Sequence, residues 1–206
     1  MIAIVDYGVG NLYSLSSSIR AVGGDVVVTG DKEVIKKADK ILLPGVGAFA
    51  DAITKLRQSG LDTVIEEEVK KGKPLLGICL GMQLLFEKSY EYGEHDGLGF
   101  IKGKVVAMQG VIPEKLKVPQ IGWNYLKFHK SHPLLKYIKE GDFVYFVHSY
   151  YATDCEEDLL LSTEYGAPIT AAVVNKNVVG MQFHPEKSGE VGLNLLRAFI
   201  EWEYKE

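Results

Sequence analysis

A cysteine between two glycines marks the point where a short apolar run meets a helical pattern. The run that ends at Ile78 is typical of a buried strand, and the segment from Leu80 to Phe86 is compatible with a helix. Cys79 lies at the join, between Gly77 and Gly81. A turn this tight needs minimal side chains two residues before and two residues after the nucleophile, which explains both glycines. The pattern predicts a nucleophile elbow with cysteine in place of serine.

The position of Cys79 at a helix start has two chemical consequences. The helix dipole and the free N–H groups there favour the thiolate over the thiol. The backbone N–H of Leu80 would point to the place where an oxyanion forms during attack on a carbonyl group. The alternative is a buried structural cysteine between two packing glycines, and the elbow alone does not decide between these interpretations.

A second candidate group follows the apolar strand pattern of residues 178–183. A cysteine nucleophile needs a base, and the base needs an acceptor that orients it. His184 can take the thiol proton, and Glu186 can fold back onto the far imidazole nitrogen across Pro185, which stiffens the turn. His-Pro-Glu alone also fits an ordinary loop at a strand end. Together with the elbow it favours a catalytic triad of Cys79, His184 and Glu186.

These motifs resemble those of the class I (triad) glutamine amidotransferases, which share residues 77–83 and the His-Pro-Glu segment. Further segments narrow the resemblance to the glutaminase subunits of imidazole glycerol phosphate synthases. They are residues 6–12, 43–49, 121–124 and 184–188. Because these segments run from the first strand nearly to the C-terminus, the resemblance covers the whole chain.

The resemblance implies a reaction and a partner. The chain is expected to hydrolyse glutamine to glutamate and ammonia, without a cofactor. The ammonia would pass to a cyclase subunit that forms imidazole glycerol phosphate and an aminoimidazole-carboxamide ribonucleotide in histidine biosynthesis. One glutaminase domain uses the whole chain, so nothing remains to bind an ammonia acceptor. This independently favours a separate partner, and we expect a heterodimer.

Several residues are candidates for holding glutamine and its oxyanion. Gln83 lies four residues after Cys79 and would project from the same helix face. By resemblance, Gly47 and the Ser149-Tyr150 pair contact the substrate. The turn at residues 44–47 is either a plain strand-to-helix connection or the source of the second oxyanion donor, which is the N–H of Val46 or of Gly47. A peptide there that points its carbonyl oxygen at the site would keep the free subunit inactive.

Other residues are candidates for the partner interface or for coupling to the partner. The first loop could be a phosphate cradle, but the residues favour a tight structural turn, and the resemblance implies that this loop faces the synthase partner. Further candidates lie in motifs shared with the subfamily that have no part in the acyl chemistry. The set comprises Val9, Asn11, Trp123, Asn124 and Lys187.

Composition excludes several other classes of protein. The chain has 206 residues, 47% hydrophobic and 24% charged, and a net charge of −4 with no large basic cluster, which argues against nucleic acid as a main partner. No signal peptide or membrane-length apolar run is present. Cys79 and Cys155 cannot form a disulfide framework if one is a working thiolate, so we expect a cytoplasmic protein. Cys155 lies among carboxylates and is interpreted as inert.

No metal site is expected, because the remaining histidines lack cysteine or carboxylate neighbours at ligand spacing. Two alternatives stay open on function. The chain could be the glutaminase subunit of another synthase, for anthranilate or pyridoxal phosphate, although the Gly-Trp-Asn and Lys187-Ser188 segments argue against this. It could also be a catalytically silent docking subunit, against which the intact triad argues.

The elements that must position these residues indicate a single α/β domain spanning residues 1–206. Alternation of strands and helices in the first half predicts a mostly parallel central sheet flanked by helices, with an antiparallel extension. Cys79 then lies at the carboxyl end of a strand, where such folds place their sites. Strands are expected at 2–5, 26–29, 40–43, 75–78, 100–108, 121–128, 145–151, 171–174 and 178–183. Helices are expected at 12–22, with Asn11 as the N-cap, and at 50–58, 60–71, 80–86 and 191–204, and loops at 87–97 and 111–120.

Overall fold

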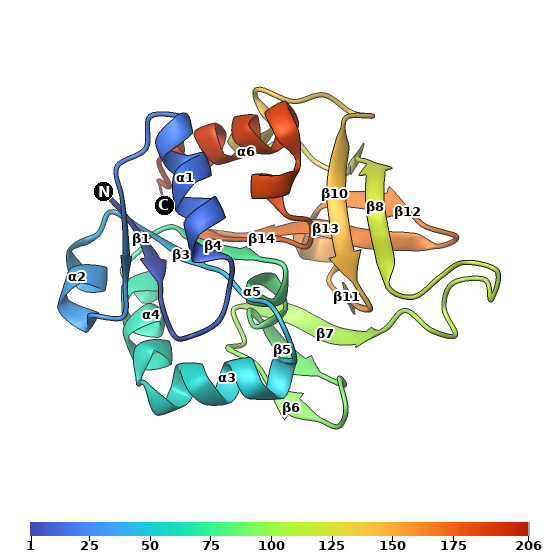
Figure 1. Cartoon of the computed structure of the whole chain (residues 1–206), viewed down its shortest axis with the longest axis horizontal. Coiled ribbons are helices and arrows are strands. Elements are labelled where there is room, and N and C mark those ends of the chain that lie inside the picture. The colour runs from blue at the N-terminus through green and yellow to red at the C-terminus, as the bar shows by residue number, and fades with distance from the viewer. Residues whose placement is uncertain (206) are drawn as a thin grey trace.

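The structure, a computed structural model that describes residues 1–205, is built on an eight-stranded sheet (Figure 1). In spatial order the strands are β2 (Val26–Thr29), β1 (Ile2–Val5), β3 (Lys40–Leu43), β4 (Leu75–Ile78), β14 (Val178–Met181), β13 (Pro168–Asn175), β12 (Leu159–Glu164) and β9 (Lys127–Phe128). The pairs from β2 to β14 are parallel and those from β14 to β9 are antiparallel. This arrangement confirms the predicted fold class.

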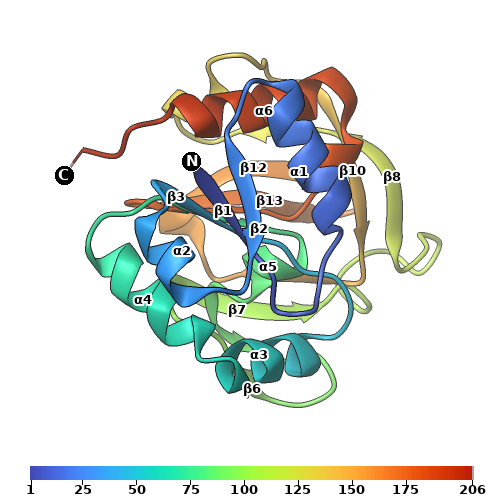
Figure 2. The ribbon, with the colours of Figure 1, turned by 60° about the vertical axis from the view of Figure 1, so that its left-hand side comes forward.

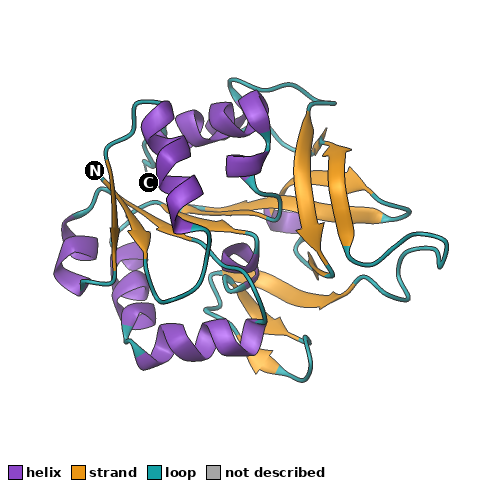
Figure 3. Ribbon diagram, viewed as in Figure 1, coloured by secondary structure: helices purple, strands orange, loops and turns teal. Residues whose placement is uncertain are grey.

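Helices cover both faces of the parallel half of the sheet. One face carries α1 (Leu12–Ala21) and α6 (Gly189–Glu201), and the opposite face carries α3 (Phe49–Gln58) and α4 (Leu61–Lys70) (Figures 1 and 3). The short helix α2 (Lys32–Lys37) packs against α4 at the edge of the sheet (Figure 2). Among residues 1–205, no helix combines the length and the apolar character needed to cross a membrane.

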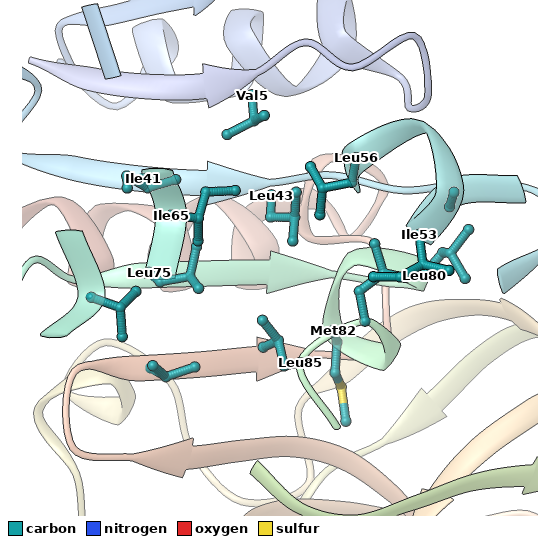
Figure 4. Close-up of a cluster of buried hydrophobic side chains, with 14 of the residues drawn as sticks. Val5, Ile41, Leu43, Ile53, Leu56, Ile65, Leu75, Leu80, Met82 and Leu85 are labelled. Atoms are coloured by element: carbon teal, nitrogen blue, oxygen red, sulfur yellow. The ribbon is translucent and has the colours of Figure 1, made fainter. Parts of the chain in front are cut away.

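The parallel strands bury both of their faces. In β3, Ile41 and Leu43 pack into the cluster under α3 and α4 (Figure 4), whereas Leu42 packs into the cluster under α1 and α6. All three side chains are fully buried. A strand covered on both sides needs apolar residues at successive positions, which explains the continuous apolar runs in the sequence.

Two smaller sheets stand beside the main one, where the sequence predicted longer single strands. β8 (Gln120–Tyr125) pairs antiparallel with β10 (Phe143–His148). The other sheet has the order β11 (Tyr150–Thr153), β7 (Ile101–Ala107), β5 (Phe86–Ser89) and β6 (His95–Asp96). The strand expected at 145–151 is therefore two strands in different sheets, because the buried alternation of β10 stops at Ser149. The strand expected at 121–128 divides in the same way around the buried Leu126.

The prediction of a helix from Leu80 to Phe86 is wrong in length, because the helix in the structure is shorter. The helix α5 is a single turn, Leu80–Gln83, and Phe86 instead begins β5, where it is fully buried opposite Ile101. Apolar residues on every side of this segment gave no periodicity to separate helix from strand. Part of the predicted loop at 87–97 is also wrong, since it contains the rest of β5 and β6.

The helix α2 and the strand β12 had not been predicted either. The helix α2 begins after Asp31, whose carboxylate accepts hydrogen bonds from the N–H groups of Glu33 and Val34, an N-cap that the sequence does contain. Asn11 does occupy the N-cap position of α1, but its side chain makes no capping hydrogen bond.

Candidate active site

The turn that carries Cys79 has the strained backbone of a nucleophile elbow. Cys79 has φ of 55° and ψ of −114°, a conformation that an L-residue adopts only when its surroundings impose it. Its N–H donates to the carbonyl oxygen of Met181 at 2.7 Å, which ties the elbow to β14. A Cβ atom on Gly77 would lie 2.6 Å from the Gly81 carbonyl oxygen, and one on Gly81 would lie 1.9 Å from the Leu43 carbonyl oxygen. Both flanking glycines are therefore required by contact with backbone.

His184 and Glu186 form a buried pair next to this elbow. The imidazole Nδ1 lies 2.8 Å from Oε1 of Glu186, and both side chains are buried. Because Nδ1 donates to the carboxylate, Nε2 is left to interact with the Cys79 sulfur. Within residues 1–205, the second carboxylate oxygen of Glu186 has no hydrogen-bond partner, so the charge of Glu186 is directed at the ring.

The electrostatic environment favours the charged form of His184. Burial opposes the charge, but the hydrogen bonds and negative charges of Cys79 and Glu186 outweigh burial and raise the pKa of His184 to about 9. A protonated imidazole beside a thiolate is the form that can attack a carbonyl carbon and then protonate the leaving group.

The backbone of His184 is held by the neighbouring strand β10. The His184 N–H donates to the Tyr145 carbonyl oxygen at 2.9 Å. The Ser188 hydroxyl donates to the His184 carbonyl oxygen at 2.6 Å and accepts from the Tyr145 N–H at 2.9 Å. These three bonds fix the short turn that follows β14 and set the direction of the imidazole ring.

The turn at residues 44–47 packs directly on the elbow. A Cβ atom on Gly45 would lie 2.6 Å from the Gly81 nitrogen, so only glycine allows this approach. Gly47 has φ of 95°, and Val46 is 44% exposed at the mouth of the site. The structure thus brings the proposed donors Val46, Gly47 and Leu80 to the edge of one cavity.

That cavity has a volume of about 390 Å³ and gathers most of the predicted site residues. It is lined by Val46, Gly47, Cys79, Leu80, Gln83, Glu91, Pro119, Val147, His148, Ser149, Tyr150, His184 and Lys187. Glu186 lies behind the His184 ring. The predicted coupling residues Val9, Asn11, Trp123 and Asn124 lie outside the lining, whereas Lys187 belongs to it.

Gln83 lines the cavity, but its amide nitrogen is already used. Its Nε2 donates to the Tyr150 carbonyl oxygen at 3.1 Å and to Oε1 of Gln182 at 3.0 Å. An amide NH2 group has two protons, so Gln83 has only its oxygen left to offer a substrate in this arrangement.

Glu91 is a cavity residue that the sequence did not reveal. It lies in the connection between β5 and β6, in a segment interpreted as a plain loop. Its carboxylate accepts a hydrogen bond from the Phe49 N–H at 2.6 Å, at the start of α3 and just after the proposed oxyanion turn. A carboxylate in loop sequence carries no pattern, and only the fold brings it to the cavity.

His148 also lines the cavity, and its environment argues against a catalytic role. Its ring nitrogens lie 2.8 Å from the Tyr150 carbonyl oxygen and 2.9 Å from the Gln120 side chain. Burial lowers the pKa of His148 to about 4, so the ring is neutral. The second cysteine, Cys155, is likewise unreactive, because burial raises its pKa to about 11.

The predicted coupling residues fall into two groups. Trp123 is 51% exposed and stacks edge-on against Tyr145, and the Lys187 ammonium lies 5.9 Å from the centre of the Tyr145 ring. Asn124 instead points inward, where it accepts a hydrogen bond from the Gln120 amide and donates to the Glu164 carbonyl oxygen. Trp123 and Lys187 therefore share an outer surface that Asn124 does not.

The first loop, with Val9 and Asn11, lies against Pro44, the first residue of the turn at 44–47. Tyr7 donates its hydroxyl proton to the Pro44 carbonyl oxygen at 2.7 Å, and Gly10 approaches the Pro44 ring closely. Among residues 1–205, no group of three or more His, Cys, Asp and Glu side chains is arranged to hold a metal ion.

Comparisons with known proteins agree with this geometry. The family model of glutamine amidotransferase class-I matches residues 3–202. The chain is 50% identical over 203 residues to imidazole glycerol phosphate synthase subunit HisH of Geobacillus thermodenitrificans, covering 97% of this chain and 95% of the relative. It is 52% identical over 198 residues to the subunit of the same name from Aquifex aeolicus, covering 95% and 94%.

Solved structures share the fold at lower sequence identity. A crystal structure of a glutamine amidotransferase has a TM-score of 0.76 at 18% identity and covers 98% of both chains. The structure of PurLQS from Thermotoga maritima has a TM-score of 0.73 at 19% identity and covers 96% of both chains. At these sequence identities the structural similarity supports a shared fold and nothing more specific.

Proposed function

The chain belongs to the class-I glutamine amidotransferase family, and from this membership we propose that it hydrolyses glutamine. It supplies the ammonia to the cyclase subunit of an imidazole glycerol phosphate synthase. Relatives about half identical over nearly their whole length carry the name of that synthase's HisH subunit. The observation that carries the proposal is the meeting of Cys79, His184 and the turn at 44–47 at one cavity, with Glu186 bound to the His184 ring from behind. Residues 1–206 would form a single domain.

The first half of the reaction is transfer of the glutamyl group to sulfur. The Cys79 thiolate attacks the side-chain amide carbon of glutamine, and charge develops on the amide oxygen. The Leu80 N–H and an N–H of Val46 or Gly47 stabilise that oxyanion. The C–N bond then breaks, and the charged His184 gives its proton to the departing ammonia. The raised pKa of His184 keeps this proton available at neutral pH.

The second half is hydrolysis of the thioester. Neutral His184 takes a proton from water, the hydroxide adds to the same carbon, and the C–S bond breaks to return the electron pair to sulfur. Glu186 holds the ring through Nδ1 in both halves, and it stabilises the charged ring without moving the proton itself.

The polar groups of the cavity suit the two charged ends of an amino acid. Glu91 is the carboxylate that lines it, and we assign it to the α-ammonium group of glutamine together with Oε1 of Gln83. We assign Ser149, just before β11, and Tyr150, its first residue, to the α-carboxylate group, because both line the cavity. Lys187 adds a positive charge to the same lining.

A flat apolar surface next to the cavity supports the docking of a partner. The antiparallel pair β8 and β10 turns one face inward and the other outward, and the outward side chains include Ile121 at 61%, Trp123 at 51% and Phe143 at 53% exposure. We call this the apolar strand face. It is completed by Tyr125, Tyr145 and Val147.

The apolar strand face meets the cavity at Val147, which is paired with Ile121 in the sheet and also lines the cavity. A partner covering this face would receive ammonia before it reached bulk water. We therefore propose a heterodimer in which the cyclase subunit docks on this face. The free thiols of Cys79 and Cys155 fit a reducing compartment, and we propose the cytoplasm.

The test is a glutaminase assay of the purified subunit with and without the cyclase and its nucleotide substrate. We expect weak ammonia release by the free subunit and release stimulated about 100-fold or more in the complex, since one oxyanion donor is worth that much in rate. Stimulation by a different synthase, or no release under any condition, would contradict the proposal.

A further inference from the structure

Gln182 lies in the bend that links the end of β14 at Met181 to His184. The Cys79 N–H donates to the Met181 carbonyl oxygen at 2.7 Å, which holds the start of this bend against the elbow. Gln182 is fully buried, and its amide nitrogen Nε2 lies 3.8 Å from the Cys79 sulfur, within reach of a hydrogen bond to sulfur.

The orientation of the Gln182 amide follows from its neighbours. The Tyr150 carbonyl oxygen can only accept a hydrogen bond, so the Gln83 atom that approaches it at 3.1 Å must be Nε2. The second proton of that nitrogen points to the Gln182 amide, 3.0 Å away, and requires an oxygen there. Gln182 is thereby left with its NH2 group directed at sulfur.

We propose that Gln182 is a catalytic residue whose amide donates a hydrogen bond to the Cys79 thiolate, and that Gln83 holds it in the donating orientation. The inference rests on the proposed function, because it deepens the role of Cys79. Sulfur carries negative charge before it attacks the amide carbon, and again when the C–S bond of the thioester breaks. An uncharged donor stabilises both states without consuming the proton of His184.

The short elbow helix increases the need for such a donor. A helix of several turns would supply a dipole at Cys79, but α5 has one turn only. Side-chain donors from the segment after β14 then supply the stabilisation. The Gln182 amide remains a donor while the proton of His184 moves to ammonia and is replaced from water.

The experiment measures the pH dependence of Cys79 alkylation by iodoacetamide in the full chain, with the Cys79 peptide quantified by mass spectrometry. Gln182→Met keeps the side-chain length but removes the donor. Gln120→Met is the matched control, because Gln120 is also fully buried and its amide bonds His148 and Asn124 instead of sulfur. Gln83→Met leaves Gln182 in place but removes its anchor. Thermal unfolding of each variant checks that it folds.

The midpoint is the pH at which the rate of Cys79 alkylation is half of its maximum. We expect it to rise by about one pH unit in Gln182→Met, with roughly tenfold slower alkylation below the midpoint. Gln83→Met should raise it less, and Gln120→Met should leave it unchanged. An unchanged midpoint in Gln182→Met, or an equal rise in Gln120→Met, would overturn the inference. If Gln182→Met does not fold, an unchanged midpoint in Gln83→Met would overturn the inference.

Failure of the proposed function would look different. If Cys79 of the unaltered chain were alkylated with a midpoint no lower than that of an ordinary thiol, about 8.5, Cys79 would not be an activated nucleophile at all. A low midpoint that Gln182→Met does not move would count against Gln182 alone.

Discussion

At the scale of single residues, the proposed mechanism depends on the charge on His184. Its pKa is about 9 in the folded protein against 6.5 for a free side chain, so the charged ring stabilises the folded state fully below pH 6.5, and that contribution is lost as the pH rises through 9. Above that pH the neutral ring cannot protonate the departing ammonia. We therefore expect glutaminase turnover to fall with a midpoint near pH 9, measured by ammonia release at saturating glutamine.

The same charges set the expected effects of two substitutions. Glu186→Gln removes one of the charges that raise the pKa of His184, so the alkaline fall in turnover should move to lower pH. The loss at neutral pH should be smaller than in His184→Ala, which removes the proton carrier. An alkaline midpoint in Glu186→Gln equal to that of the unaltered chain, or a loss as large as in His184→Ala, would show that Glu186 has another role.

The sequence indicated some residues of the proposed site and not others, for a physical reason. Cys79, His184 and Glu186 could be proposed from sequence because the chemistry of each depends on its immediate neighbours, the flanking glycines and the stiff Pro185. Glu91 and Gln182 could not, because their proposed roles depend on contacts across the fold.

At the scale of elements, the elbow depends on a glycine that touches another strand. A Cβ atom on Gly81 would meet the Leu43 carbonyl oxygen at 1.9 Å, and backbone cannot move aside as a side chain can. We expect Gly81→Ala to lower the free energy of unfolding by more than about 3 kcal/mol, measured by urea denaturation.

The control for this prediction is Gly141→Ala. Gly141 has φ of 91° but open space around its Cβ position, so alanine should cost only the backbone strain, about 1 kcal/mol. If Gly81→Ala proved no more destabilising than Gly141→Ala, the close packing of the elbow on β3 would be wrong.

The parallel strands could be predicted from sequence, and the small sheets could not. Runs such as those of β1, β3 and β4 are apolar at successive positions because both faces are covered, and their short length between polar and turn residues favours a strand over a helix. β5 shares its apolar character with α5, and only the partner strand β7 decides where helix ends and strand begins. Partners far away in sequence likewise divided the strands expected at 121–128 and 145–151.

At the scale of the whole molecule, the apolar strand face is the surface proposed to dock on the cyclase subunit. Phe143 is 53% exposed on it, so Phe143→Asp should weaken binding to the cyclase subunit by at least tenfold while leaving the thermal unfolding midpoint nearly unchanged. Isothermal titration calorimetry measures the first quantity.

Val111→Asp provides the comparison for this substitution. Val111 is 46% exposed in the loop before β8 and outside the apolar strand face, so the same change there should leave binding unaltered. Equal affinities for the two variants would mean that the partner docks elsewhere.

The central claim is that Cys79 generates ammonia that a partner consumes. The most direct measurement compares synthesis of imidazole glycerol phosphate by the complex carrying Cys79→Ser, once with glutamine and once with added ammonia. Serine nearly matches cysteine in size but is a far weaker nucleophile with this base. The account predicts less than about a tenth of normal synthesis from glutamine and near-normal synthesis from ammonia. Substantial synthesis from glutamine by the Cys79→Ser complex would contradict it.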